Sequence, residues 1–273
     1  LIGGGQEINT GEAGVSEWIE SLKQKYSDWN VYYSEKILSE RTTYLNNKEL
    51  LDWLQTSGNK ETDLHLAVSV RSFRCEKIAS FVQSLLENQP EQAKVVFSSI
   101  KNNYPIFLTR NINTAKQWLK QTAKGTERIG IVASSGGRRL RAEGIDVKNE
   151  IDPANWFLND KDDVRSSYYL EEIATEFDIQ GLEIDFTCVA WDINLHHDGK
   201  EWNYQNFKGS KWQNINQDAA RNYLLNSYRV LLTRARQGMI IFIPDVDNSD
   251  KTRTKAFYDQ TFEYLQRCGL SEI

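Results

Sequence analysis

Three arginines stand in a largely apolar run near the C-terminal end of the chain. The run reads NSYRVLLTRARQGMIIFIP, residues 226–244, and it contains Arg229, Arg234 and Arg236. Basic residues near a helix C-terminus complement the helix dipole by about 0.3–1 kcal/mol each, which explains Arg236 better than Arg229. A guanidinium is always charged and presents a planar set of donors to carboxylates and phosphates. The cluster therefore indicates a negatively charged partner.

The positions of these arginines are set by a regular alternation of strands and helices along the chain. Strands are expected at the apolar runs 1–4, 29–34, 64–70, 104–109, 128–134, 171–177, 184–193 and 239–244. Helices are expected between them, because Ile78, Phe81, Val82 and Leu85 recur at helical spacing. A further helix is expected to reach about Arg236 and stop at Gly238. The alternation predicts an α/β fold with a mostly parallel sheet flanked by helices.

Four segments together resemble a known family. YRVLLTRARQGMIIF resembles motif VI, ATEFDIQGLEIDFTCV motif V, RSFRCEKIASFV motif IV and LIGGGQEI motif III of superfamily 1 helicases of the UvrD and RecD type. They occur in the family's order over residues 1 to about 243. The nearest subgroup that we recognise contains bacterial DNA/RNA helicases related to the Schlafen helicase-like domains. The resemblance implies a RecA-like domain of the P-loop NTPase type.

The resemblance also implies roles at the nucleotide. Arg234 is similar to the arginine finger, Arg74 to a γ-phosphate contact, and Gln6 to the residue that couples the γ-phosphate to nucleic acid. The positions similar to ribose and phosphate contacts are Gln180, Gly181, Glu183 and Arg236. Phosphoryl transfer spreads negative charge over oxygens that a guanidinium stabilises well. ATP and Mg²⁺ are the implied cofactors. As an alternative, each residue taken singly is a surface polar or turn residue.

Other positions resemble the nucleic-acid track of these helicases. Thr175 of motif V is similar to a backbone contact, and SSGGRRLRAEG lies where the family has its motif IVa. The positions expected to contact single-stranded DNA or RNA are Thr175, Ser134, Ser135, Arg138, Arg139 and Trp202. Interleaved basic and aromatic residues suit single strands. The alternative for Trp202 and its aromatic neighbours is that they pack the insertion at about 194–217 onto the sheet.

The chain departs from the family's pattern in several respects. It has glycines in motif III where many relatives have aspartates, Phe177 where motif V often has His, and no Walker B Asp-Glu pair before motif III. It also contains no G-x-x-x-x-G-K-[ST] string, which a superfamily 1 ATPase needs to hold phosphates. We expect residues 1–60 to be the tail of a first RecA-like domain with a linker, and residues 61–273 to be the second. An N-terminal RecA-like domain of the same parent chain is then the expected partner, and this part alone is expected not to hydrolyse ATP.

The composition of the chain limits the classes of protein to which it can belong. The net charge is −5, so a nucleic-acid partner would need a local basic groove. Three separated cysteines argue against a disulfide scaffold and a zinc site and favour a cytoplasmic protein. No apolar run reaches the roughly 20 residues that span a bilayer. Two alternatives stay open: a non-catalytic RecA-like module that binds nucleic acid or protein, and an unrelated hydrolase using Asp160, Asp162 and Asp163.

Overall fold

A six-stranded parallel sheet lies at the centre of the larger part of the protein. The computed structural model describes residues 7–8, 14–39, 47–64 and 73–273. The chain divides into two compact units, unit 1 over Leu1–Val70 and unit 2 over Arg71–Ile273. Gln6, the strand expected at 1–4 and residues 65–70 of the strand expected at 64–70 lie outside the described residues.

Unit 1 is a small helical unit with its own core. Its elements are α1 (Val15–Lys25), β1 (Tyr32–Tyr33), α2 (Lys36–Ser39), α4 (Lys48–Ser57), β2 (Asn59–Lys60) and the 3-10 helix η1 (Thr62–Leu64). The Asn47 side chain begins α4 by accepting hydrogen bonds from the backbone N–H groups of Glu49 and Leu50. Buried residues of α1 and α4, among them Ile19 and Leu54, form the core.

Unit 2 contains the rest of the helices and strands. They are α5 (Phe73–Leu86), α6 (Pro90–Ser98), β3 (Ile106–Thr109), α7 (Ile112–Thr122), β4 (Ile129–Ala133), η2 (Arg138–Glu143), α8 (Pro153–Leu158), η3 (Ser167–Tyr169), β5 (Ile173–Thr175), α9 (Glu176–Ile179), β6 (Ile184–Ala190), β7 (Leu195–His197), β8 (Trp202–Lys208), β9 (Lys211–Asn214), α10 (Asp218–Leu232), β10 (Ala235–Phe242), α11 (Lys255–Arg267) and β11 (Ser271–Glu272). None of the described helices is long and apolar enough to cross a membrane.

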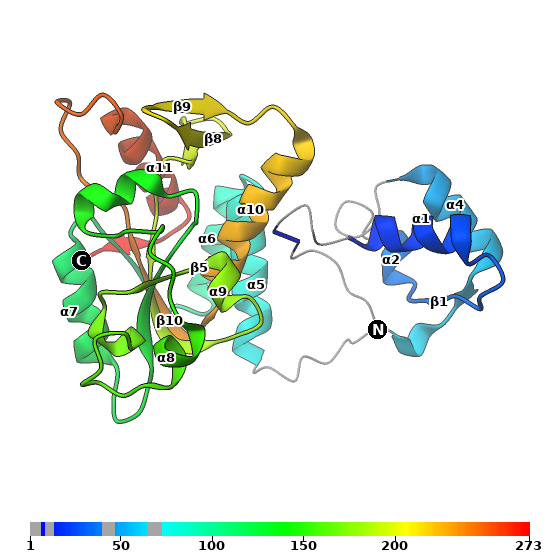
Figure 1. The fold of residues 1–273 in the computed structure, drawn as a ribbon, viewed down its shortest axis with the longest axis horizontal. Helices are drawn as coiled ribbons and strands as arrows, with labels where there is room; N and C mark the ends of the chain where they lie inside the picture. The colour runs from blue at the N-terminus through cyan, green and yellow to red at the C-terminus, as the bar shows by residue number, and fades with distance from the viewer. Residues whose placement is uncertain (1–6, 9–13, 40–46, 65–72) are drawn as a thin grey trace. The chain divides into compact units, whose positions relative to one another are not determined.

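The sheet has the strand order β11-β3-β10-β6-β4-β5, and every neighbouring pair is parallel. Alternate residues of its strands point to opposite faces. On one face, Ile131, Cys188 and Ile240 pack with Ala115 and Leu119 of α7. Figure 1 shows α5, α6 and α10 on the side of the sheet opposite to α7. The α/β prediction is therefore confirmed, with helices on both faces of an all-parallel sheet.

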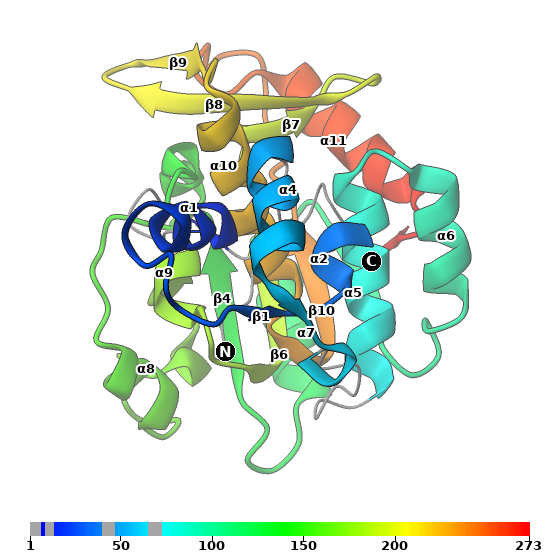
Figure 2. The same cartoon turned by 90° about the vertical axis from the view of Figure 1, so that its right-hand side faces the viewer.

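A smaller antiparallel sheet lies beside the carboxyl ends of these strands. It consists of β7, β8 and β9, and Figure 2 shows it beyond the end to which β4 points. The chain turns between β7 and β8 at Gly199, whose φ of 92° is the left-handed region that glycine adopts easily. The backbone N–H of Gln205 donates to the carbonyl of Asn194, 2.8 Å away. The small sheet is thus attached to the segment that follows β6.

Candidate nucleotide and nucleic-acid sites

The residues of motifs V and VI meet where β6 and β10 begin. These strands are neighbours, with Ala235 opposite Ile184, and the N–H of Ile184 donates to the carbonyl of Arg234 at 3.1 Å. Glu183 directly precedes Ile184, as Arg234 directly precedes Ala235. The fold therefore brings Arg234 and Glu183, which are 51 positions apart in the sequence, to the same edge of the sheet.

The prediction that a helix extends over Arg234 to about Arg236 is wrong, because the helix ends before both residues. Helix α10 ends at Leu232, and Thr233 closes it with φ −115°. The Thr233 hydroxyl donates to the carbonyl of Arg229 at 2.8 Å, which satisfies a carbonyl at the helix end. Arg234 lies in the connection to β10, and Arg236 lies on the strand itself. Their spacing therefore does not follow a helical surface.

Arg234 is one of the largest fully buried side chains, with 1% of its surface exposed. Nearby, the Tyr104 hydroxyl donates to the carbonyl of Ala235 at 2.8 Å and fixes the start of β10. A buried guanidinium is costly unless it is paired or hydrogen-bonded. For Arg234 to contact a nucleotide on another domain, its guanidinium must become accessible from its position in this unit.

Arg236 has a partner within the same sheet. Its Nη2 lies 3.0 Å from Asp185 Oδ1, and half of its side chain is exposed. Gln237 donates to the same oxygen at 3.0 Å, and the backbone N–H of Arg128 donates to Asp185 Oδ2 at 2.8 Å. Asp185 therefore collects three donors and fixes the first residues of β10. Arg236 can support this edge of the sheet while still facing solvent.

Gly181 is exposed in the turn between α9 and β6. Its φ is 84°, and a Cβ built on it would meet nothing within 4 Å. The glycine is therefore required by the backbone angle and not by close packing within the chain. Gln180 ends α9 beside it and is partly buried. The turn presents its backbone openly, as a contact to a nucleotide would require.

At the opposite, carboxyl edge of the sheet, Ser135 is held by a buried carboxylate. Glu176 is 3% exposed, and it accepts hydrogen bonds from the backbone N–H of Ser135 at 2.8 Å and from its hydroxyl at 2.7 Å. Burial raises the pKa of Glu176. Ser134 Oγ accepts from Asn194 Nδ2 at 3.0 Å. The loop after β4 is thus tied to β5 and β6 through side chains, and its two serines are occupied within the protein.

Thr175 begins α9 as a capping box. Both its backbone N–H and its hydroxyl donate to Asp178 Oδ2 at 2.7 Å. Such a cap satisfies donors that the first turn of a helix leaves free. The structure therefore gives Thr175 a positioning task at the carboxyl edge, one residue before Glu176.

The two arginines after β4 differ in their environments. Arg139 Nη2 forms an ion pair with Asp250 at 2.8 Å, and its backbone N–H donates to Asp192 Oδ2 at 2.8 Å. Arg138 is partly buried and makes no ion pair with any described residue. Of the two, Arg138 is the one whose charge remains available to an anionic ligand at this edge.

Sequence reasoning missed Asp192, which is fully buried at the carboxyl end of β6. It accepts hydrogen bonds from the Tyr258 hydroxyl at 2.6 Å and from the backbone N–H groups of Ile193 and Arg139, both at 2.8 Å. Burial raises the pKa of its carboxyl group. Its position near the end of the strand expected at 184–193 was the available signal, because functional and structural polar groups gather at this edge of parallel sheets.

Trp202 lies inside the packing of unit 2 and is 7% exposed. Its ring stacks on Trp191, with centroids 5.6 Å apart, and its Nε1 donates to the carbonyl of Leu85 at 3.3 Å. Trp202 is therefore a packing residue of the insertion, as the alternative interpretation of the sequence predicted.

Of the remaining expected positions, Gln6 lies outside the described residues. Arg74 is in the first turn of α5, but the position of its side chain is also outside them. The rival carboxylates offer no catalytic pair. Asp163 pairs with Arg165 at 2.7 Å, and this hydrogen bond holds its pKa well below the usual range, while Asp160 and Asp162 are exposed. A hydrolase site on this loop therefore has no support in the geometry.

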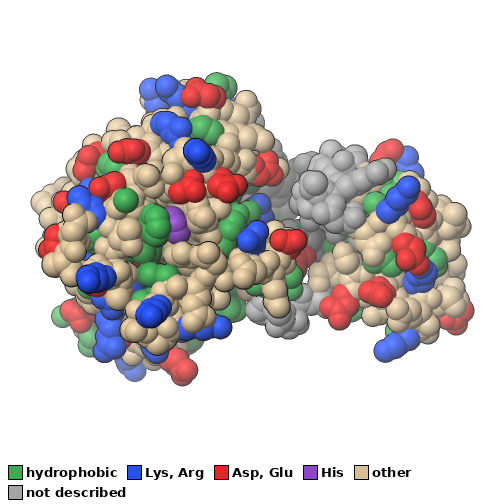
Figure 3. Space-filling view, turned by 90° about the horizontal axis from the view of Figure 1, so that it is seen from above, with side chains coloured by type: hydrophobic (Ala, Val, Ile, Leu, Met, Phe, Trp, Pro, Cys, Tyr) green, Lys and Arg blue, Asp and Glu red, His purple; other side chains and the backbone are tan. Residues whose placement is uncertain are grey.

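The charges are mixed over the end of unit 2 that carries the small sheet. Figure 3 shows Lys and Arg side chains interspersed there with Asp and Glu. Within the described ranges, no group of three or more His, Cys, Asp or Glu residues could hold a metal ion. An anion or a nucleic acid at this end would therefore depend on individual basic residues such as Arg138.

The all-parallel sheet with helices on both faces is consistent with a RecA-like helicase domain. Comparison with family models makes the assignment specific. The chain matches the Schlafen group 3 DNA/RNA helicase domain over residues 1–245 and belongs to this family. Searches of the curated proteins and of the solved structures gave no significant match. Family membership implies NTP-driven helicase activity and association with DNA or RNA.

Proposed function

We propose that this chain is the C-terminal portion of an ATP-dependent DNA/RNA helicase or translocase of the superfamily 1 type. In this proposal it supplies the arginine finger, Arg234, to a nucleotide held mainly by an N-terminal RecA-like domain of the parent chain. The single observation that carries the proposal is the meeting of Arg234 and Glu183 at the adjoining starts of β10 and β6. It brings the most specific residues of two separate motifs to one edge.

The chemistry of this edge suits a nucleoside triphosphate. ATP supplies the phosphoryl group, and Mg²⁺ neutralises part of its charge. Arg234 would stabilise the charge on the transferred group, and Glu183 would accept a hydrogen bond from a ribose hydroxyl. The open backbone of the turn at Gly181 would lie beside the nucleotide with Gln180, and Arg236 would hold Asp185. Gln6 and Arg74 are proposed to contact the γ-phosphate.

The opposite edge is proposed as part of the nucleic-acid track. The loop after β4 carries Ser134, Ser135, Arg138 and Arg139, and it is held in place by Glu176 through Ser135 and by Asn194 through the Ser134 hydroxyl. A fixed loop with one available guanidinium suits contacts to a phosphate backbone, which position a strand without reading its sequence. Thr175 pairs with Ala133 directly before this loop, and motif V continues from Thr175 through α9 to the opposite edge of the sheet.

One observation favours a second candidate function. Arg234 is almost fully buried within the chain, as it would be in a RecA-like module that binds nucleic acid or protein without catalysis. In that case the Arg234 side chain has a structural role within unit 2 and does not contact a nucleotide.

ATP turnover by the parent protein separates the two functions. We expect single-stranded DNA or RNA to stimulate ATP hydrolysis by the parent protein, and we expect this 273-residue portion alone to have no turnover. Binding of nucleic acid by the parent protein without any ATP turnover would establish the non-catalytic module instead.

A further inference from the structure

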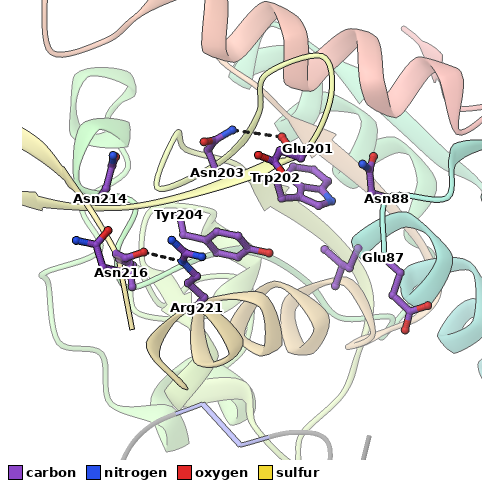
Figure 4. A pocket seen from close by; sticks show the side chains of 11 residues that line it. Glu87, Asn88, Glu201, Trp202, Asn203, Tyr204, Asn214, Asn216 and Arg221 are labelled. Carbon is purple, nitrogen blue, oxygen red and sulfur yellow. Dashed lines mark hydrogen bonds between the residues drawn. The ribbon is translucent and has the colours of Figure 1, made fainter. Parts of the chain in front are cut away.

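A cavity of about 410 Å³ lies between the end of α5, the small sheet and the start of α10 (Figure 4). Ligand pockets in proteins usually measure about 300–1,000 Å³, so this cavity is large enough for a nucleobase or a nucleoside. Its walls come from three separate elements, and none of the residues named above for the nucleotide lines it. The buried Trp202 also belongs to its wall.

Among the described residues, four amide side chains line the cavity. Asn88, Asn203, Asn214 and Asn216 all belong to its wall. The Asn88 amide is used within the protein, since it donates to the carbonyl of Lys200 at 2.6 Å. Asn216 is exposed, and its side chain makes no hydrogen bond to any described residue. Amide groups present a donor and an acceptor together, which matches the edge of a base.

Tyr204 supplies an aromatic surface in the same cavity. It lies two positions after Trp202 on β8, so both side chains project from the same face of the strand. The Arg221 guanidinium carbon is 5.9 Å from the centroid of the Tyr204 ring. Figure 4 shows the Tyr204 hydroxyl pointing away from Arg221, toward the Glu87 side of the cavity. The hydroxyl makes no hydrogen bond to the residues that the structure describes, and the aromatic ring is the part of Tyr204 that a base would contact.

The charges in the wall select the kind of ligand. Glu87 and Glu201 place two carboxylates at the cavity, against the single guanidinium of Arg221. A phosphate inside the cavity would be repelled by this excess of negative charge. An uncharged group that donates N–H hydrogen bonds to carboxylate and amide oxygens is favoured. Adenine, cytosine and guanine carry such an amino group, whereas uracil and thymine do not.

The position of the cavity connects it to a strand of nucleic acid. Asn194 links the two regions, because its carbonyl accepts from Gln205 of β8 and its amide donates to Ser134 in the loop after β4. We propose that this cavity binds one unstacked, amino-bearing base of a single-stranded nucleic acid, with Tyr204 as the stacking surface and Asn216 as a partner for the base edge. This subsite rests on the proposed nucleic-acid-binding function.

Fluorescence anisotropy of a labelled oligodeoxyadenylate measures how each residue of the subsite contributes to binding. Tyr204→Ala is expected to weaken binding about tenfold, the size of the loss of one base–aromatic stack, whereas Tyr204→Phe keeps the ring and stays within about twofold of wild type. Asn216→Ala, at an exposed side chain without bonds in the protein, is expected to weaken binding about threefold. Tyr169→Ala removes an exposed tyrosine from η3 and serves as the control. Oligodeoxythymidylate is expected to bind more weakly than oligodeoxyadenylate.

Each other result overturns the subsite. Binding by Tyr204→Ala and Asn216→Ala as tight as by wild type removes the cavity from the track and leaves the proposed function intact. Lack of oligonucleotide binding by the wild-type protein sinks the proposed function as well. If AMP protects the cavity from chemical modification at Tyr204 without displacing the oligonucleotide, the cavity takes a free nucleotide, and the assignment to a strand is wrong.

Discussion

Glu176 and Ser135 join the ends of two neighbouring strands through a pair of hydrogen bonds, 2.8 Å to the serine backbone N–H and 2.7 Å to its hydroxyl. The carboxylate is buried, and the two residues are 41 positions apart in the sequence. Because β5 ends at Thr175 and β4 at Ala133, this contact fixes the loop that the resemblance assigns to nucleic acid. Its removal should therefore affect both stability and binding.

We expect Glu176→Ala to lower the free energy of unfolding by about 1–3 kcal/mol, because it leaves two partly buried donors of Ser135 without their acceptor. Glu176→Gln is expected to be milder, since its amide oxygen can accept from the N–H and its amino group can donate to the hydroxyl oxygen. Urea unfolding measures both, with the exposed Glu171→Ala as a control. Equal stability of Glu176→Ala and wild type would show that the clamp contributes nothing.

Acid is expected to destabilise the protein through His197. The Nδ1 of this buried side chain accepts from the backbone N–H of Gly199 at 3.0 Å, and Nε2 lies 2.9 Å from the Asn88 amide oxygen. Burial lowers its pKa from 6.5 to about 4. Between pH 6.5 and pH 4 His197 is protonated in the unfolded chain and neutral in the folded protein. The contribution of His197 to the free energy of unfolding is therefore complete above pH 6.5 and is lost as the pH falls toward 4.

Urea unfolding at several pH values between 7 and 4 measures this loss. His197→Phe keeps an aromatic ring against Tyr264 but does not titrate, so its stability should depend less steeply on pH, by up to about 1.4 kcal/mol per pH unit for one proton. Burial also lowers the pKa of His196, so part of the dependence should remain. An unchanged pH dependence in His197→Phe would exclude His197 as its source.

Gly181→Ala tests the turn that precedes β6. The φ of 84° makes alanine unfavourable by about 1 kcal/mol, although space around the residue is free. Gly125 provides a matched control, because its φ is 59° and a Cβ there would also meet nothing within 4 Å. Both variants should lose similar stability, but only Gly181→Ala should weaken ATP binding by the parent protein. Equal ATP affinities in the two variants would remove the turn from the nucleotide site.

The sequence predicted the helices and strands whose apolar residues recur at a regular spacing. Ile78, Phe81, Val82 and Leu85 repeat at helical spacing and indeed lie on one helix, α5. Helix α4 also has a local signal, because the Asn47 side chain caps it and Leu50 and Leu54 recur at helical spacing. Arg234 was placed on a helix because its neighbours fit a helical period, which Thr233 interrupts.

For the candidate site, the sequence predicted the short motifs but not the contacts between them. The short motifs identified Arg234, Glu183 and Ser135, but nothing local indicated that Ser135 would bond to Glu176 or that Tyr258 would reach Asp192, 66 positions away. Such contacts depend on the order of strands in the sheet. The depth at which Arg234 is buried depends in the same way on packing from several elements and has no signature in neighbouring residues.

The most direct test of the proposed function is nucleic-acid-stimulated ATP turnover by the parent protein carrying Arg234→Ala. Loss of an arginine finger reduces turnover by on the order of 10³–10⁵-fold, and we expect that loss with nucleic-acid affinity within about threefold of wild type. Arg229→Ala, which removes a partly buried arginine from α10, serves as the control with intact turnover. Turnover by a folded Arg234→Ala protein within about tenfold of wild type, well short of that loss, would contradict the assignment of Arg234 as the arginine finger.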